Sequence, residues 1–128
     1  QKMPKTPPEP KRQTSLNALE PAFAAKVRLL LAAMRRRLYD PIVFEAKRTV
    51  ERQAWLYGVG RTHSKHRKPV SWFRPPFEKA PHVQGRAVDI ISKKHWWGHA
   101  GFFRALKIEA NKVGLSVLRV EQCHVEQR

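Results

Sequence analysis

The chain has 128 residues, enough for one domain with a hydrophobic core but too few for a second domain of ordinary size. Lysine and arginine number 26 against 10 aspartate and glutamate, for a formal net charge of +16, and the 41 % of hydrophobic residues argues against global disorder. No stretch approaches the roughly 18 uncharged apolar residues of a membrane span, no secretory signal is visible, and a single cysteine excludes an internal disulfide and a multi-cysteine zinc finger.

The N-terminal stretch differs in composition from the rest. Residues 1–15 contain Pro4, Pro7, Pro8 and Pro10 and almost nothing apolar. This composition predicts a disordered, basic, proline-rich tail, followed by a single domain over residues 16–128.

Hydrophobic spacing and turn residues predict the elements of that domain. In chain order they are a helix over 19–38, a short buried strand over 42–44, a helix over 50–57 capped by Thr49, a strand over 87–91, a helix over 100–113, and one or two strands within 115–125. Residues 61–81, rich in proline and basic side chains, are expected to form a long loop. The order predicts an α+β fold, with helices packed on one face of a small sheet.

One motif in the middle of the chain suits a metal site. His82 and Asp89 stand in the pattern H-x-x-G-x-A-x-D, and zinc binds imidazole and carboxylate groups, usually three from the protein at a catalytic site. Their spacing fits one ligand before a tight turn at Gly85 and another on the following strand, where Val88 and Ile90 would face the core. The pattern is equally compatible with a surface histidine and a solvated aspartate.

A third ligand must come from elsewhere, and E-x-x-H near the C-terminal end of the sequence offers one. His124 would complete a His/Asp/His site with a fourth position left for water, and Glu121 could accept the proton of that water. In a regular strand the two side chains would face opposite sides, so a bend between them is required. Taken alone, the motif also fits two solvated residues.

Together these motifs resemble the zinc peptidases of the VanX and D-alanyl-D-alanine carboxypeptidase group, peptidase family M15. Phage endolysins that act as L-alanyl-D-glutamate peptidases look most similar. The segment from Lys47-Arg48-Thr49 to Gln53 and Leu56 resembles the arginine segment of that family. The resemblance covers about residues 16–126 and implies a Hedgehog/DD-peptidase-like α+β fold, a small antiparallel sheet with helices packed on one face.

The resemblance also implies a role for each site residue. One zinc ion would be held by His82, Asp89 and His124, with Glu121 as the general base. Arg48 would bind the substrate, polarise its carbonyl and stabilise the oxyanion. The chemistry agrees, because amide hydrolysis develops negative charge on a tetrahedral oxygen that a metal ion and a fixed guanidinium can stabilise.

The function expected on this basis is hydrolysis of an amide bond in a peptidoglycan stem peptide, such as L-Ala–D-Glu, by a monomeric endolysin. D-Ala–D-Ala dipeptidase or carboxypeptidase activity is the second expectation. The net charge would concentrate the enzyme on anionic cell-wall or outer-membrane polymers. An endolysin without a signal would be made in the host cytoplasm and reach the wall after release through a holin.

The sequence departs from the family's pattern at three positions. Ala80 stands where many members have serine two residues before the first histidine ligand. Lys47 precedes the arginine in place of an aromatic or small residue, and Cys123 replaces the usual aromatic before the last ligand. These departures leave the metal ligands unchanged and weaken any detailed prediction of the substrate.

Two hypotheses from other classes remain open on sequence grounds. Basic and aromatic residues interleave in the loop over 61–81, as in a protein that binds single-stranded nucleic acid. A zinc-stabilised interaction domain without catalysis is the other.

The remaining candidate ligands have simpler interpretations. His63 and His66 are expected to have a role in the basic loop, such as contact with the cell wall or a polyanion. His95 and His99 are expected to lie at the start of a helix. Cys123 is expected to be a half-buried thiol that binds no metal.

Overall fold

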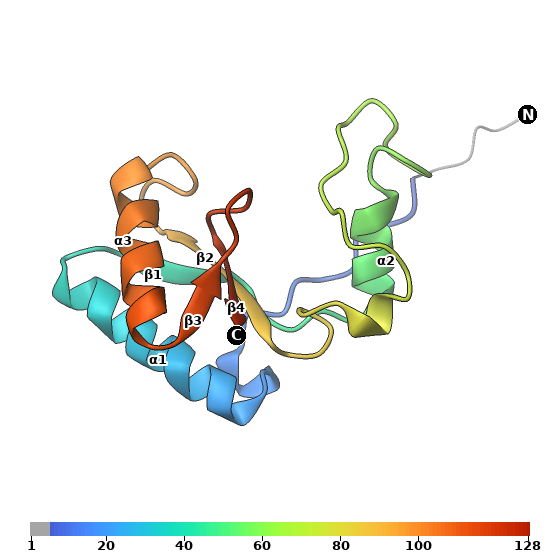
Figure 1. Ribbon diagram of the computed structural model, residues 1–128. Helices are drawn as coiled ribbons and strands as arrows, with labels where there is room; N and C mark the ends of the chain where they lie inside the picture. The colour runs from blue at the N-terminus through green and yellow to red at the C-terminus, as the bar shows by residue number, and fades with distance from the viewer. Residues whose placement is uncertain (1–5) are drawn as a thin grey trace, which may run out of the picture.

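The computed structural model describes residues 6–128 (Figure 1). Its elements are η1 (Leu16–Ala18), α1 (Pro21–Arg36), β1 (Pro41–Glu45), α2 (Val50–Gly58), η2 (Phe77–Lys79), β2 (Ala87–Ser92), α3 (Ala100–Lys112), β3 (Leu115–Val117) and β4 (His124–Gln127). The helices predicted from the sequence end within two residues of these bounds. Among the described residues, no helix combines the length and the apolar character needed to span a membrane.

The four strands form one antiparallel sheet in the order β1-β2-β4-β3. Helices α1 and α3 pack against each other, α1 also contacts β1, and α3 contacts β3. Side chains from these helices and from β2 build the core, whose largest buried members include Phe23, Leu30, Phe102, Leu106 and Ile90. The α+β prediction is therefore confirmed.

Two details differ from the sequence-based expectation. Residues Ile42–Phe44 are half-buried rather than buried, because β1 is an edge strand of the sheet. Helix α2 lies apart from α1 and α3 (Figure 1) and contacts η2, so α1 and α3 cover the sheet without it.

Each long helix begins with a side chain that satisfies free backbone N–H groups. The Glu20 carboxylate accepts from the first turn of α1, and the Thr49 hydroxyl accepts from Arg52 N at 3.1 Å at the start of α2. His99 Nδ1 accepts from Phe102 N at 3.0 Å at the start of α3, which agrees with its predicted place at a helix entry.

The cap of α2 provides a stability test. Thr49→Ala should lower the free energy of unfolding by about 1 kcal/mol, because the Arg52 N–H loses its acceptor. Chemical denaturation of both proteins measures this difference. Thr14→Ala is the control, since Thr14 is exposed, and its effect should stay within about 0.5 kcal/mol. Equal losses in the two variants would contradict the assignment of the cap.

Residues 6–15 contain no helix or strand, yet they follow a defined path, in contrast to the tail predicted from composition. The contacts that hold them are Trp55 Nε1 to Pro7 O at 2.7 Å, Arg52 Nη1 to Glu9 Oε2 at 2.8 Å and to Pro10 O at 2.7 Å, and Ala46 N to Gln13 O at 2.7 Å. The physical reason is that the buried Arg52 side chain and the Trp55 indole both need acceptors, and this segment supplies them. The prediction of disorder for residues 1–5 lies outside the described residues.

The long loop after α2 has no α-helix or β-strand between residues 61 and 81, as predicted, and includes only η2. It is anchored at its start, where Arg61 Nη1 donates to Tyr57 O at 2.6 Å and to Ser71 O at 2.8 Å. His63 Nε2 lies 2.8 Å from Trp55 O, so this histidine attaches the loop to α2.

Candidate metal centre

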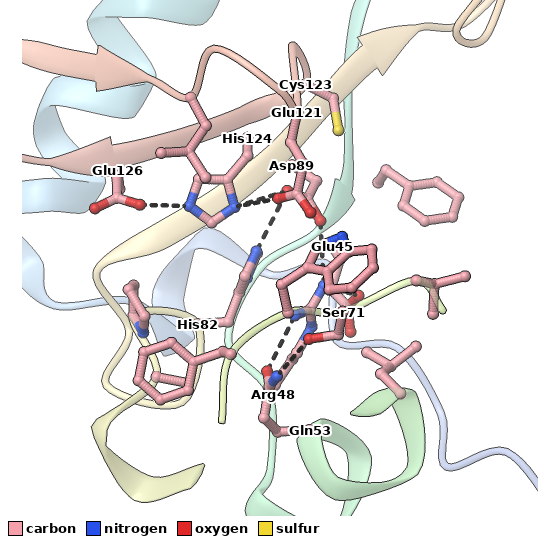
Figure 2. Close-up of a pocket in the computed structure, with 18 of the residues that line it drawn as sticks. Glu45, Arg48, Gln53, Ser71, His82, Asp89, Glu121, Cys123, His124 and Glu126 are labelled. Carbon is pink, nitrogen blue, oxygen red and sulfur yellow. Dashed lines mark hydrogen bonds and ion pairs between the residues drawn. The ribbon is translucent and has the colours of Figure 1, made fainter. Parts of the chain in front are cut away.

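The three predicted ligands come together at the middle of the sheet (Figure 2). His82 lies in the turn before β2, Asp89 lies on β2, and His124 begins β4 directly opposite Asp89 in the antiparallel register. One potential ligand atom from each residue lies within 4.8 Å of the others, and all three residues are buried. Among residues 6–128 no other group of three histidine, cysteine, aspartate or glutamate residues meets this spacing.

The turn before β2 positions His82 as the sequence predicted. Gly85 has a φ of +71°, in the left-handed region that favours glycine, and its carbonyl accepts from Glu20 N at 2.9 Å. The His82 carbonyl accepts from Arg48 N at 2.9 Å, which ties this turn to the segment after β1. Val88 and Ile90 are fully buried in the core, so Asp89 faces the opposite side of β2.

In each imidazole, the nitrogen that points away from Asp89 forms a hydrogen bond with an acceptor of the protein. The other nitrogen is then available to bind a metal. His82 Nδ1 lies 2.8 Å from the Ala46 carbonyl, an acceptor only, so His82 Nε2 carries a lone pair in the neutral ring and lies 3.3 Å from Asp89 Oδ1. His124 Nε2 donates to Glu126 Oε1 at 2.8 Å, and His124 Nδ1 lies 3.5 Å from the same Asp89 oxygen.

When both imidazole rings are neutral in these tautomers, the three atoms are all acceptors, and acceptors this close repel one another unless a metal ion or a proton lies among them. Ligand atoms about 2.0–2.1 Å from a tetrahedral zinc ion are separated by roughly 3.3 Å, close to the 3.3 and 3.5 Å found here. The cluster therefore has the donor types, spacing and supporting hydrogen bonds of a site for one zinc ion.

The pKa values of the site residues also indicate that the cluster stabilises a positive charge. Burial raises the pKa of Asp89, but the positive charges of His82 and Arg48 and the hydrogen bonds from both histidines hold it well below its usual range. Burial lowers the pKa of His124, but Asp89 and Glu126 raise it above the ordinary value. In the metal-free protein a proton thus supplies part of the positive charge that a metal ion would bring.

Glu121 lies beside the cluster, on the loop that leads into β4. The required bend is present, because a turn in which His124 N donates to Glu121 O at 2.9 Å separates the two residues. Glu121 Oε2 lies 3.7 Å from His124 Nδ1, and its side chain is 39 % exposed. A carboxylate in this place can reach both the cluster and solvent, although its role as general base stays a prediction.

Arg48 lies on the other side of Asp89. Its guanidinium donates to Asp89 Oδ2 at 3.4 Å and to Gln53 Oε1 at 3.1 Å, and it forms an ion pair with Glu45 Oε1 at 3.1 Å. Three partners from β1, β2 and α2 hold the group in one place next to the cluster. Its Nε is buried and has no hydrogen-bond partner among residues 6–128. This placement fits the predicted role toward the substrate carbonyl, which itself remains untested.

Two supporting residues had no role in the sequence-based prediction. Glu126 orients His124, and the pattern H-x-E on a strand could have indicated it, because residues two apart share a face. Ser71 is buried and its hydroxyl accepts from Gln53 Nε2 at 3.1 Å, which extends the network from Asp89 through Arg48. No sequence signal marks Ser71, since it lies within the long loop.

Glu126 provides a test of the metal site. Glu126→Ala should weaken zinc binding by about 10–100-fold, because His124 loses the carboxylate that fixes its orientation and tautomer. Competition with a chromogenic chelator measures the affinity. The control is Gln127→Ala, since Gln127 bonds to Glu20 on the other face of β4 and its loss should leave zinc affinity unchanged. Equal affinity in all three proteins would contradict the assigned role of Glu126.

The cluster lies in a cleft of about 1110 Å³ whose lining comes from both the sheet and the α2 region. Trp97 and Phe44 line it from the sheet side, and Trp72 and Phe73 line it from the long loop. Cys123 also lines the cleft but lies outside the cluster, and burial raises the pKa of its thiol to about 12. Cys123 is half-buried, as predicted from the sequence.

No protein-family model matches this sequence, and no curated protein matches it significantly. Solved structures do resemble it. One is the vancomycin-resistance D,D-pentapeptidase VanY from a VanB-type resistance cassette in complex with Zn(II), at 18 % identity and a TM-score of 0.69, covering 96 % of this chain and 84 % of that one.

Two other similar structures carry different activities in their names. One is the L-Ala D-Glu endopeptidase ChiX of Serratia marcescens, at 20 % identity and a TM-score of 0.53, covering 88 % of this chain and 83 % of that one. The other is the L,D-carboxypeptidase DacB of Streptococcus pneumonia, at 19 % identity and a TM-score of 0.62, covering 86 % and 66 %. The chain therefore shares its α+β fold with peptidases whose names specify D,D, L,D and L-Ala–D-Glu bonds.

Proposed function

We propose that this protein is a zinc-dependent peptidase that hydrolyses an amide bond of a peptidoglycan stem peptide, between L-Ala and D-Glu. The observation that carries the proposal is the convergence of His82 Nε2, His124 Nδ1 and Asp89 Oδ1 within a cleft. Glu121 and Arg48 flank that convergence. The fold shared with three named peptidases supports it.

In the proposed mechanism, zinc bound to the cluster would polarise the scissile carbonyl and make a water molecule acidic enough to react near neutral pH. Glu121 takes a proton from the attacking water and passes it to the leaving nitrogen, since its side chain reaches both the cluster and solvent. Arg48 donates hydrogen bonds to the oxygen on which negative charge develops. Glu45 and Gln53 hold that guanidinium in place, so little reorganisation is needed.

A second candidate is D-Ala–D-Ala dipeptidase or carboxypeptidase activity at the same site. The observation in its favour is the higher TM-score with VanY, 0.69, than with ChiX, 0.53. Both candidates use the same five residues and differ only in which bond the cleft places over the metal.

The proposal extends to the protein's setting. The net charge of +16 supports binding to anionic cell-wall or outer-membrane polymers, which would concentrate the enzyme near its substrate. The endolysin role rests on the sequence resemblance: synthesis in a host cytoplasm, release through a holin, and action on the wall as a monomer.

Digestion of purified peptidoglycan tests the proposal and separates the candidates. Zinc-loaded protein should release new amino termini, and a chelator should abolish the release. Mass spectrometry of the products identifies the bond, because cleavage after L-Ala and loss of terminal D-Ala give different masses. Failure to cleave any peptidoglycan would refute the proposal. Tight, strongly salt-dependent binding to single-stranded nucleic acid without cleavage would favour the rival class instead.

A further inference from the structure

The acidic side chains that line the cleft have partners within the protein, whereas some of its arginines have no acidic partner in the part of the chain that the structure describes. The acidic ones interact with groups of the protein itself: Glu9 with Arg52, Glu45 with Arg48 and Arg52, Asp89 with Arg48 and both histidines, and Glu121 and Glu126 with His124. Three arginines that line the same cleft, Arg12, Arg67 and Arg119, have no carboxylate within 4.0 Å among residues 6–128. Three arginine side chains of the cleft are therefore left without a carboxylate partner among the described residues.

The surrounding structure holds Arg12 in place. Its guanidinium carbon lies 3.9 Å from the centroid of the Phe44 ring, a close cation–π contact. Phe44 in turn packs edge-on against Trp97, with ring centroids 4.8 Å apart. The backbone is attached on both sides, because the carbonyl of Pro10 accepts from Arg52 and that of Gln13 accepts from Ala46.

A guanidinium stacked on a ring by its face keeps its in-plane N–H groups free to donate. These N–H groups match a carboxylate, which accepts two parallel hydrogen bonds. Ordering by Phe44 and by the two backbone bonds lowers the entropy that binding would otherwise cost. Arg12 is thus a prepared site for a carboxylate, in the same cleft as the metal cluster.

We propose that Arg12 binds a free carboxylate of the substrate and so makes the cleft selective for acidic peptides. This inference rests on the proposed function and specifies its substrate class. In a stem peptide, D-glutamate is joined to the next residue through its side chain and keeps its α-carboxylate near the L-Ala–D-Glu bond. Conversion of that carboxylate to a carboxamide removes the charge and hardly changes the shape.

Calorimetric binding of two synthetic peptides tests the proposal. Both are L-Ala–γ-D-Glu–L-Lys, one with a free α-carboxylate on glutamate and one with a carboxamide. They are titrated into the zinc-loaded Glu121→Gln protein, in which turnover is suppressed. The acid should bind about tenfold more tightly than the amide, and adding Arg12→Gln should remove this ratio by weakening the acid alone. Lys11→Gln is the matched control, since Lys11 is exposed, carries the same charge and does not line the cleft.

Equal affinity for acid and amide in the parent protein would overturn the proposal. So would an unchanged ratio in the Arg12→Gln protein, an equal loss in the Lys11→Gln control, or the absence of binding by either peptide. Cleavage of peptidoglycan by the unsubstituted protein is measured separately. If that protein cleaves nothing, the proposed peptidase function fails, while the ratio of the two affinities still decides whether Arg12 recognises a carboxylate.

Discussion

Glu121→Gln should leave zinc bound and lower the turnover of peptidoglycan by about 10²–10⁴-fold, the usual contribution of a general base. The amide of glutamine cannot take a proton from water, whereas its size and polarity nearly match those of glutamate. Among residues 6–128 the Glu121 side chain makes no hydrogen bond that the ligands depend on, and its Oε2 lies 3.7 Å from His124 Nδ1. Zinc content should therefore stay near one ion per chain, measured by elemental analysis, while the rate of new amino termini falls.

The matched control for this variant is Glu78→Gln. Glu78 lies on η2, is exposed and does not line the cleft, so its removal changes the net charge equally without touching the site. Its turnover should equal that of the unsubstituted protein. Full activity of the Glu121→Gln protein would remove Glu121 from the mechanism, and loss of zinc together with activity would make it a ligand or a structural group instead.

The sequence predicted the elements, and it predicted that His82 and Asp89 lie together, because both predictions rest on local patterns. Helical periodicity and caps such as Thr49 need only near neighbours. The motif from His82 to Asp89 contains its own turn, with Gly85 supplying the positive φ. His124 was harder, because only the pairing of β2 with β4 brings it opposite Asp89. The resemblance to a known family supplied that long-range relation.

Contacts between distant segments account for what the sequence could not predict. Residues 6–15 look disordered by composition, and contacts with distant residues give them a defined path. Pro7 and Pro10 accept hydrogen bonds from Trp55 and Arg52 on α2, and Gln13 accepts one from Ala46. Ser71 joins the site because the long loop folds back over Gln53. The half-buried state of β1 depends on its place at the edge of the sheet. None of these long-range contacts produces a periodic pattern in the sequence from which it could be predicted.

Asp89→Asn should abolish stoichiometric zinc binding and, with it, any turnover. The carboxylate lies between the two histidines, with Asp89 Oδ1 3.3 Å from His82 Nε2 and 3.5 Å from His124 Nδ1, and a neutral amide is a far weaker ligand for zinc. Zinc should raise the melting temperature of the unsubstituted protein, because a ligand that binds only the folded state stabilises it. That rise should disappear in the Asp89→Asn protein.

The variant should also be less stable than the unsubstituted protein when both are free of metal. Because the pKa of Asp89 is held below its usual range, its ionised form stabilises the fold at neutral pH, and this contribution is lost as the pH falls through the lowered pKa. Asparagine removes it at every pH, so the two metal-free proteins should converge in stability toward strong acid. The control is Asp40→Asn. Asp40 directly precedes β1, and its carboxylate accepts from Ser92 Oγ at the end of β2 at 2.8 Å and from Lys94 N at 2.7 Å. The Asp40→Asn protein should lose some stability but keep its zinc and its turnover.

Zinc binding retained by the Asp89→Asn protein would refute the metal centre as described.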